Sequence, residues 1–354
     1  SIHMTNAVKN RVTTPERKTT PLVINGDMNL AQRSTSVTGL GDGDEGYVTV
    51  DRFRHTAAAS AGRFTSKQTA VDDLDGFQNC LELDCTTADT SIAATELLQI
   101  DCRLEGQDMQ HFKKGETNAE YITVSFYAKA DAAVAYACEL QDIDNSRHIS
   151  KLFTTGTDWT HHVLSFPGDT TGNFGDDANE SLRISLILHA GSNFTEGTLA
   201  SSWASYNDAN SAAGIGSFYA ATTRSLKITG FQVEAGDYNA STLPPFQYES
   251  VGANRSRCHR YFVTTYNEGV VPGTNGSKHG AIFVYRQRDN NYAGFNFQFP
   301  VSMRTIPAQV RYAFDGTTGE AVSSTTNFTS ATNHAINGTS SIVGYGTATA
   351  ADDC

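Results

Sequence analysis

Apolar and polar residues alternate along several stretches of the chain. In residues 121–129, YITVSFYAK, one face carries Ile122, Val124 and Phe126, and the other carries mainly polar side chains. The same two-residue period runs through residues 80–85, 97–106 and 181–189. Successive side chains of a strand point to opposite faces, so this period predicts half-buried antiparallel strands.

Turn-forming residues separate these stretches, and a sustained helical period is absent. The chain contains 30 glycines, with many serines, threonines, asparagines and aspartates between the apolar runs. Short strands joined by such turns are typical of a two-layer β-sandwich. We expect helices of only one or two turns, at residues 92–98 and 250–261. The sequence therefore predicts an all-β fold.

Residues 225–234, SLKITGFQVE, change the face of their apolar positions in the middle of a strand. Leu226 and Ile228 are two residues apart, but Phe231 follows after an odd step. One unpaired residue turns every later side chain to the other face, and glycine tolerates the backbone angles of a bulge. We therefore predict a single strand with a bulge at Gly230.

Pro244 and Pro245 end this segment, because proline has no N–H for a strand ladder and favours an extended exit. A domain boundary near residue 250 follows. We expect an N-terminal arm or attachment peptide (1–20), a large sandwich domain (21–250) and a smaller C-terminal β domain (251–354) with a polar, low-complexity end.

The C-terminal region begins as strand and ends in small polar residues. GAIFVYRQ (280–287) and the alternating phenylalanines of 295–299 predict strands. From about residue 315 the chain is mostly Gly, Ser, Thr, Asn and Ala, which bury little apolar surface. We expect this tail to lie against a partner chain or to remain loosely ordered.

Charge divides the chain in the same place. The net charge is −12, yet residues 251–354 contain more Lys and Arg than Asp and Glu, so the acidic excess lies in residues 1–250. This balance argues against nucleic-acid binding. No apolar run is long enough to span a bilayer. The six cysteines form no CxxC pair, so we expect small buried side chains there rather than a zinc site.

Several blocks resemble a known family. LVINGDMNLAQRSTS (22–36), GYVTVDRF (46–53), DWTHHVLSFPGDTTG (158–172), ITGFQVEAGDYNASTLPPFQY (228–248) and RCHRYF (257–262) occur in order. They resemble the virion appendage proteins of marine bacteriophages, which are tail-fibre-like structural proteins. The resemblance implies a jelly-roll sandwich of the carbohydrate-binding-module type, a small β module after it, a virion location and a homotrimer.

Motifs for catalysis are missing. No GxSxG motif marks a nucleophile. A glycan hydrolase needs two carboxylates that face each other, and the many aspartates here lie mostly in turns, where they cap the backbone. We expect a protein that is not an enzyme and needs no cofactor.

Large aromatic residues in a polar loop suggest a different activity. The loop SSWASYNDANSAAGIG (201–216) contains Trp203 and Tyr206 among small residues. Sugars offer apolar C–H faces to aromatic rings, and amides or carboxylates bind their hydroxyls. The candidate glycan-binding residues are Trp203, Tyr206, Asn207, Asp208 and Asn210. The alternative is that Trp203 plugs the end of the sandwich or contacts another subunit.

Two pairs of charged residues have a structural explanation. Asp42 and Asp44 lie in GLGDGDEGY, which lacks the spacing of an EF-hand and suits a turn into a GYVTVDRF strand. The alternative is a structural Ca²⁺ bound by these two residues. For the neighbouring pair Asp51 and Arg52, we expect Arg52 to make a structural ion pair.

The favoured hypothesis is a tail fibre or related phage appendage that contacts a host surface or glycan without catalysis. Its partners would be two further copies of itself and other virion proteins, reached through the N-terminal arm, with no nucleic acid and no membrane insertion. The alternatives are a purely structural capsid decoration, head fibre or tail adaptor and, less favoured, a polysaccharide depolymerase.

Overall fold

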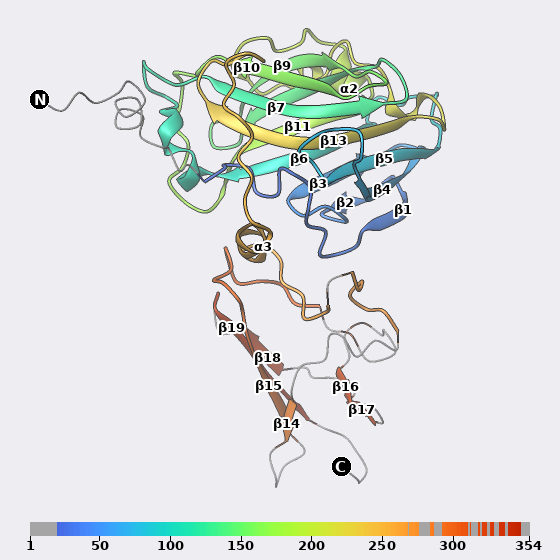
Figure 1. Cartoon of the computed structure of the whole chain (residues 1–354), viewed down its shortest axis with the longest axis vertical. Helices are drawn as coiled ribbons and strands as arrows, with labels where there is room; N and C mark the ends of the chain where they lie inside the picture. Colours follow the sequence, from blue (N-terminus) through green and yellow to red (C-terminus); the bar gives the residue numbers. More distant parts are fainter. Residues whose placement is uncertain are drawn as a thin grey trace, which may run out of the picture.

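The computed structural model describes residues 20–267, 269–275, 284–286, 292–310, 312, 318, 321–323, 326–328, 333–336 and 339–347. Its larger part is built from two antiparallel sheets that face each other, and a smaller β module lies beyond a helix (Figure 1). The predicted arm, residues 1–20, falls outside the described residues except for its last residue.

The two sheets contain six and seven strands. In order across the sheet, the six-stranded one contains β1 (Ser36–Leu40), β4 (Arg63–Ala70), β5 (Asn79–Thr87), β13 (Ser225–Ala235), β7 (Ile122–Ala130) and β10 (Thr160–Phe166). The seven-stranded one contains β12 (Ala204–Ser205), β9 (Arg147–Thr154), β8 (Ala135–Asp142), β11 (Glu180–Ala190), β6 (Leu97–Glu105), β3 (Phe53–Ala58) and β2 (Glu45–Gly46).

The chain passes repeatedly from one sheet to the other. From β5 onward the chain alternates between the sheets. Strands β5, β7, β10 and β13 belong to the six-stranded sheet, and the strands between them, β6, β8 with β9, and β11 with β12, belong to the seven-stranded sheet. All of these strands pair antiparallel. This path is that of a jelly-roll β-sandwich, and it confirms the predicted fold class.

The apolar faces of the two sheets meet in one core. At its centre the rings of Phe126 and Phe231 stack with centroids 5.6 Å apart, and Phe53 meets Phe231 edge-on at 5.5 Å. The predicted alternation holds in β6, β7 and β11, whose inward-facing apolar residues belong to this core. The five described cysteines are buried and free, as expected: Cys80, Cys85, Cys102, Cys138 and Cys258.

Strand β13 changes register in its middle. Its pairing with β7 shifts between Thr229 and Gln232. Gly230 has φ +63°, a left-handed value that favours glycine. Ile228 before the shift and Phe231 after it both belong to the core. The odd step in the sequence is therefore the point where the backbone bulges.

His55 lies on the core face of β3. Its Nε2 is 2.9 Å from the Ser66 hydroxyl, while its buried Nδ1 has no hydrogen-bond partner among the described residues. Burial, with a smaller contribution from the charge of Arg54, lowers the pKa of His55 from 6.5 to about 4. Between these two pH values the unfolded chain binds a proton here that the folded chain does not.

We therefore expect the free energy of unfolding to be highest above pH 6.5 and to fall as the pH drops toward about 4. Urea unfolding at a series of pH values would measure it. The variant His55→Leu should flatten this dependence, because Ser66 keeps Thr49 Oγ1 at 2.8 Å as a partner. Burial also lowers the pKa of His161, His162 and His259, so these residues contribute to the slope that remains. An unchanged pH profile in the variant would contradict the assignment.

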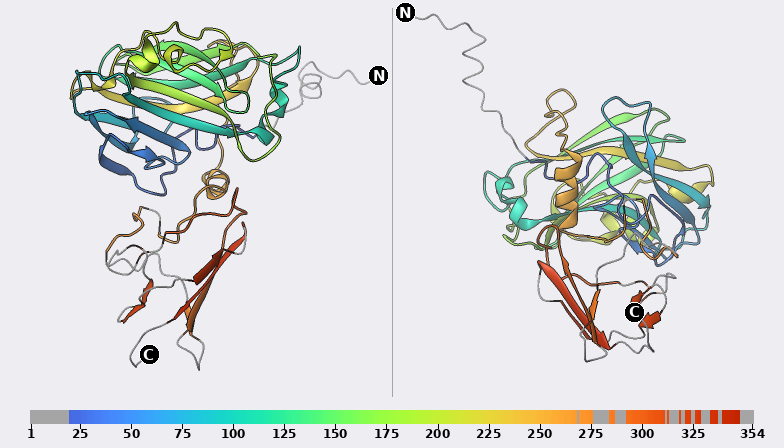
Figure 2. Two further views of the ribbon diagram at one scale, coloured as in Figure 1. Left: turned by 180° about the vertical axis from the view of Figure 1, so that it is seen from behind. Right: turned by 60° about the horizontal axis from the view of Figure 1, so that its bottom comes forward.

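Helix α3 (Val251–His259) joins the sandwich to the C-terminal module, after the exit at Pro244 and Pro245 (Figures 1 and 2). The Ser250 side chain caps the helix by accepting the N–H of Ala253. Buried Asn254 fixes the helix to the sandwich, because its Oδ1 accepts the backbone N–H of Asn25 at 2.9 Å. The helix predicted at 250–261 is confirmed.

The C-terminal module contains a four-stranded sheet and a hairpin. The sheet order is β14 (Val284–Arg286), β15 (Tyr292–Gln298), β19 (Ser341–Thr347) and β18 (Asn333–Ile336), and the hairpin pairs β16 (Ala321–Ser323) with β17 (Thr326–Phe328). In the described part of the tail, β19 pairs with β15 of the same chain. Backbone pairing needs no large apolar side chains, so small polar residues can form these strands. Contact of the tail with a partner chain stays a prediction.

Two local predictions are wrong. Residues 92–98 form turns that lead into β6 rather than a helix, and GYVTVDRF is mostly irregular, with β3 beginning only at Phe53. In both places tertiary contacts override the local pattern: the backbone of Asp51, for example, pairs with Leu30 instead of a strand. No helix in the described ranges is long and apolar enough to cross a membrane.

Candidate functional site

The outer face of the seven-stranded sheet carries polar side chains, and we call it the polar face. Its residues alternate with the core residues along β3, β6, β8, β9 and β11, and register aligns them in rows. One row contains His148, Gln141, Arg183 and Arg103. The next contains Ser150, Glu139, Ser185, Asp101 and Arg54. Hydrogen-bonding groups thus cross five adjacent strands.

Carboxylates hold three arginines in place on the polar face. Arg103 lies 3.3 Å from Asp101 and 3.1 Å from Glu180. Arg183 donates its Nε to Glu180 at 2.7 Å, and Arg54 lies 3.7 Å from Asp101. Burial alone would lower the pKa of Arg183, but Glu180 raises it above its ordinary value. Such charge-assisted contacts pre-organise the face for a ligand, because little side-chain freedom remains to be lost.

A loop covers one end of the polar face and opens a cavity beside it. Ala212 and Phe194, both between β11 and β13, pack on Ala137 and Ile187 of the sheet in a small apolar cluster. Next to this cluster lies a cavity of about 410 Å³. Its lining includes Arg54, Gln99, Arg103, Gln141, Arg183, Tyr206 and Asp208.

Tyr206 lies at the rim of this cavity, with about 36% of its surface exposed. Its ring meets His148 edge-on at 5.0 Å, and its hydroxyl donates to Asp208 Oδ1 at 2.6 Å. Burial first, and then the Asp208 hydrogen bond, raise the pKa of Tyr206, so the phenol stays neutral at physiological pH. These contacts hold the ring in place, and about a third of the residue's surface remains exposed, as a platform for stacking requires.

Trp203 belongs to a different environment. It packs against the main core, and its Nε1 donates to the Pro167 carbonyl at 2.7 Å. The Lys114 ammonium lies 5.6 Å from the centre of its ring. The position fits the alternative in which this residue plugs the sandwich rather than the one in which it stacks on a sugar.

The two asparagines of the predicted set hold the loop itself. Asn207 caps a short helical turn, η3 (Asp208–Asn210), by accepting the N–H of Ala209 at 3.2 Å. Asn210 Oδ1 accepts the N–H of Thr198 at 3.0 Å. Of the five predicted residues, the structure therefore brings Tyr206 and Asp208 to the polar face, places Asn207 and Asn210 in the support of the loop and packs Trp203 against the main core.

Asp51 and Arg52 differ from the expectation. Asp51 forms the ion pair, with Arg33 at 3.3 Å, and also accepts from Gln32 at 2.8 Å. Arg52 forms no ion pair within the described residues. It donates instead to the carbonyl of Arg103 at 2.8 Å. Arg52 has φ +73°, and its guanidinium lies 3.5 Å from the centre of the Tyr261 ring, so packing on this ring takes the place of the expected ion pair.

Asp42 and Asp44 act in a turn. Asp42 Oδ1 accepts the N–H of Ala59 at 2.6 Å, and Asp44 Oδ2 accepts the N–H of Gly41 at 2.8 Å. In the described part of the chain no group of three or more His, Cys, Asp or Glu side chains could hold a metal ion. The alternative of a calcium ion at Asp42 and Asp44 stays a prediction.

The residues that sequence reasoning missed are the sheet arginines Arg54, Arg103 and Arg183. Each occupies an outward position of an alternating strand, so a signal existed in the pattern. The pattern does not show that β3, β6 and β11 are neighbours, which is what gathers the three side chains.

Fold and site together define a jelly-roll sandwich with a pre-organised polar face on its larger sheet. No protein-family model matches the sequence, and no curated protein matches it. Solved structures give distant likenesses. The enzymatically active domain of tailspike protein 4 from bacteriophage CBA120 matches at 10% identity and a TM-score of 0.32, over 61% of this chain and 21% of that chain.

Two carbohydrate-binding modules match at similar levels. The family 11 module of a cellulosomal cellulase from Clostridium thermocellum is 12% identical with a TM-score of 0.29, over 57% of this chain and 96% of that one. The module TmCBM61, solved with β-1,4-galactotriose, is 9% identical with a TM-score of 0.28, over 52% and 88%. At these TM-scores the likenesses carry no argument, and the fold assignment rests on the strand order above.

Proposed function

We propose that the protein is a non-catalytic phage appendage protein that contacts glycans through the polar face of its jelly roll. One observation carries the glycan part: the partly exposed side chain of Tyr206 borders a cavity lined by arginine and amide groups. A sugar can stack its apolar face on the ring while its hydroxyls bond to groups such as Gln141 and Arg183.

The virion location and the trimer rest on the sequence resemblance. The open edges of the six-stranded sheet, β1 and β10, are compatible with packing against other copies, because an unpaired strand edge favours further association. Three copies would multiply weak sugar contacts by avidity. Light scattering on the purified chain measures the copy number, and mass spectrometry of purified particles tests the location.

The absence of catalysis is part of the proposal. The carboxylates of the polar face are already engaged: Asp101 and Glu180 with arginines, and Glu139 with His148 at 2.7 Å. A glycosidase needs one carboxyl group free to donate a proton and another to act as base or nucleophile. Release of reducing ends from a bound polysaccharide would overturn this part.

Replacing Tyr206 with alanine should weaken glycan binding about tenfold, which corresponds to about 1.4 kcal/mol, because the stacking surface is lost. Stability should change little, since the ring lies at the rim. Affinity electrophoresis and an array of β-linked glucan and galactan oligosaccharides measure the binding.

Trp203→Ala and Tyr121→Ala serve as the comparison variants. Trp203→Ala should lower stability by about 2 kcal/mol, because its half-buried ring packs on the core, and should affect binding less than Tyr206→Ala. Tyr121 is a similarly exposed tyrosine outside the cavity lining, so its loss should leave binding unchanged. Full binding by Tyr206→Ala would favour the purely structural alternative.

A further inference from the structure

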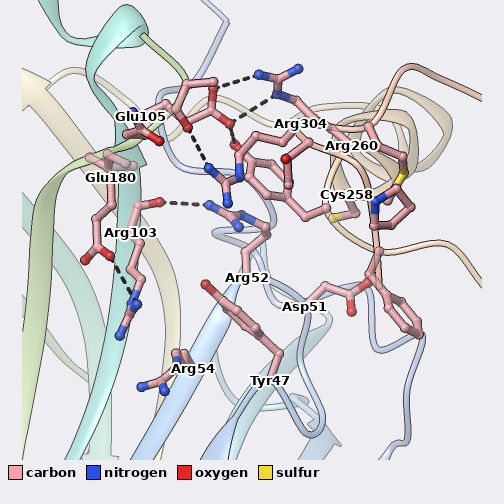
Figure 3. Close-up of a pocket in the computed structure, with 18 of the residues that line it drawn as sticks. Tyr47, Asp51, Arg52, Arg54, Arg103, Glu105, Glu180, Cys258, Arg260 and Arg304 are labelled. Carbon is pink, nitrogen blue, oxygen red and sulfur yellow. Dashed lines mark hydrogen bonds and ion pairs between the residues drawn. The ribbon is translucent and has the colours of Figure 1, made fainter. Parts of the chain in front are cut away.

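A second cavity, of about 430 Å³, lies where the polar face meets α3 and the segment around Met303, and we call it the junction pocket (Figure 3). Six arginines and three carboxylates contribute to its lining. The arginines are Arg33, Arg52, Arg54, Arg103, Arg260 and Arg304. This is a local excess of positive charge in a chain whose net charge is −12.

The three lining carboxylates are already paired with arginines. The pairs are Asp51–Arg33 at 3.3 Å, Glu105–Arg260 at 2.8 Å and Glu180–Arg103 at 3.1 Å. Arg54 has a further carboxylate, Glu45, at 2.8 Å outside the lining. Arg52 and Arg304 remain, and in the described residues neither forms an ion pair.

Arg52 is held rigidly without a counter-ion. It is 9% exposed, its guanidinium lies 3.5 Å from the centre of the Tyr261 ring, and it donates one hydrogen bond, to a carbonyl. A buried guanidinium without a counter-ion is unfavourable, so this arrangement favours the binding of an anion. The fork of N–H donors on the Arg52 guanidinium suits a carboxylate or sulfate group.

One further group in the junction pocket points to the same ligand. Arg304 comes from the C-terminal segment, is exposed, and donates to the carbonyl of Ala178 at 2.9 Å. N–H donors of Arg52 and Arg304, from two separate segments of the chain, thus remain for a ligand.

We propose that the junction pocket binds an oxyanion, namely the carboxylate or sulfate ester of an acidic saccharide. The saccharide carrier rests on the proposed function, whereas the anion site rests on the arginines themselves. Arg54 and Arg103 line both cavities, so one chain of sugars can lie on the polar face and place its acidic group at Arg52 and Arg304.

The anion site is tested without any glycan by equilibrium dialysis of the full chain against radiolabelled sulfate at constant ionic strength. We expect saturable binding that weakens about tenfold or more in Arg304→Gln, because a charge-assisted hydrogen bond is lost. Arg304 is exposed, so this variant should fold, which its circular-dichroism spectrum checks. Arg52→Gln, if it folds, should lose binding altogether.

Lys227→Gln is the charge-matched control. Lys227 lies on β13 in the other sheet, outside both cavity linings, and its removal changes the net charge by the same amount. This variant should bind sulfate like the unmodified chain. Absence of saturable sulfate binding, or equal loss in the Lys227 and Arg304 variants, would overturn the anion site.

The carrier is tested with matched oligosaccharides: oligogalacturonate against its methyl ester, and a sulfated galactan oligosaccharide against its desulfated form. We expect the acidic member of at least one pair to bind more tightly, and Arg304→Gln to abolish the preference while Tyr206→Ala weakens both members. Equal binding of both members would overturn the acidic-saccharide inference and leave the proposed function standing. Sulfate binding without any saccharide binding would instead count against the saccharide carrier and the proposed function together.

Discussion

Replacing Lys114 with methionine should lower the free energy of unfolding by about 3–5 kcal/mol, the largest effect that we expect from a single side chain. The ammonium of Lys114 is buried and lies 2.5 Å from Asp142 and 3.2 Å from Asp169. It also donates to the carbonyls of Thr171 and Gly172 at 2.8 and 2.9 Å. Methionine has a similar length but no charge, so it would leave two buried carboxylates with one fewer cation.

The neighbouring residue provides a matched control. Lys113 carries the same side chain but is exposed, and its partner Glu120 at 2.9 Å is exposed as well. An exposed ion pair contributes about 0–1 kcal/mol, so Lys113→Met should have a small effect. Chemical denaturation monitored by circular dichroism compares the two variants. Lys114, Asp142 and Asp169 form what we call the Lys114 cluster. Similar losses in both variants would show that burial of this cluster does not matter for stability.

The Lys114 cluster also explains the behaviour expected of Trp203. Burial alone would raise the pKa of Asp169, but hydrogen bonds from Arg147 and the charge of Lys114 lower it below its ordinary value. Asp169 is therefore charged at neutral pH, and the Lys114 ammonium beside it lies 5.6 Å from the centre of the Trp203 ring. An indole ring in this place shields the cluster from water, which is a structural role.

Substituting Gly230 by alanine should destabilise the sandwich by about 3 kcal/mol, for two reasons. The backbone has φ +63°, which strains any residue with a Cβ. In addition, that Cβ would lie 2.7 Å from Phe77 Cζ and 2.9 Å from Tyr127 Cδ2. Both rings belong to a packed aromatic group, with centroids 5.4 Å apart, so neither can move freely.

Gly39→Ala separates the two reasons. Gly39 has φ +76°, but a Cβ there would meet nothing within 4 Å. Its substitution should therefore cost about 1 kcal/mol, from backbone strain alone. Thermal and urea unfolding of both variants measure the difference. If the two substitutions were equally mild, the bulge would have room for a side chain and our account of the close packing at Gly230 would fail.

Local pattern determined much of the sandwich. The two-residue period of the sequence puts the apolar residues of β6, β7 and β11 on one face of each strand, and that face is buried because apolar surface leaves water. The odd step at Gly230 likewise marks a register shift that the backbone makes. These features are readable from sequence because they depend on neighbours within a few residues.

Strand neighbours were decided by tertiary structure. β13 lies between β5 and β7, although more than 90 residues separate β13 from either strand in the chain. The sheet arginines form one surface only because β3, β6 and β11 are adjacent. Alternation predicts which way a side chain points but not which strand lies beside it, since pairing depends on the folded core as a whole.

The same reason divides the candidate site. The composition of the loop identified Tyr206 and Asp208, which reach the polar face, but it could not separate them from Trp203, which turns toward the core. For Arg52 the sequence indicated a structural side chain, and only the folded chain put Tyr261 beneath it and left its charge without a carboxylate. The sequence shows which chemical groups a residue carries. Which groups lie beside it depends on contacts between distant segments, and these contacts form only when the chain folds.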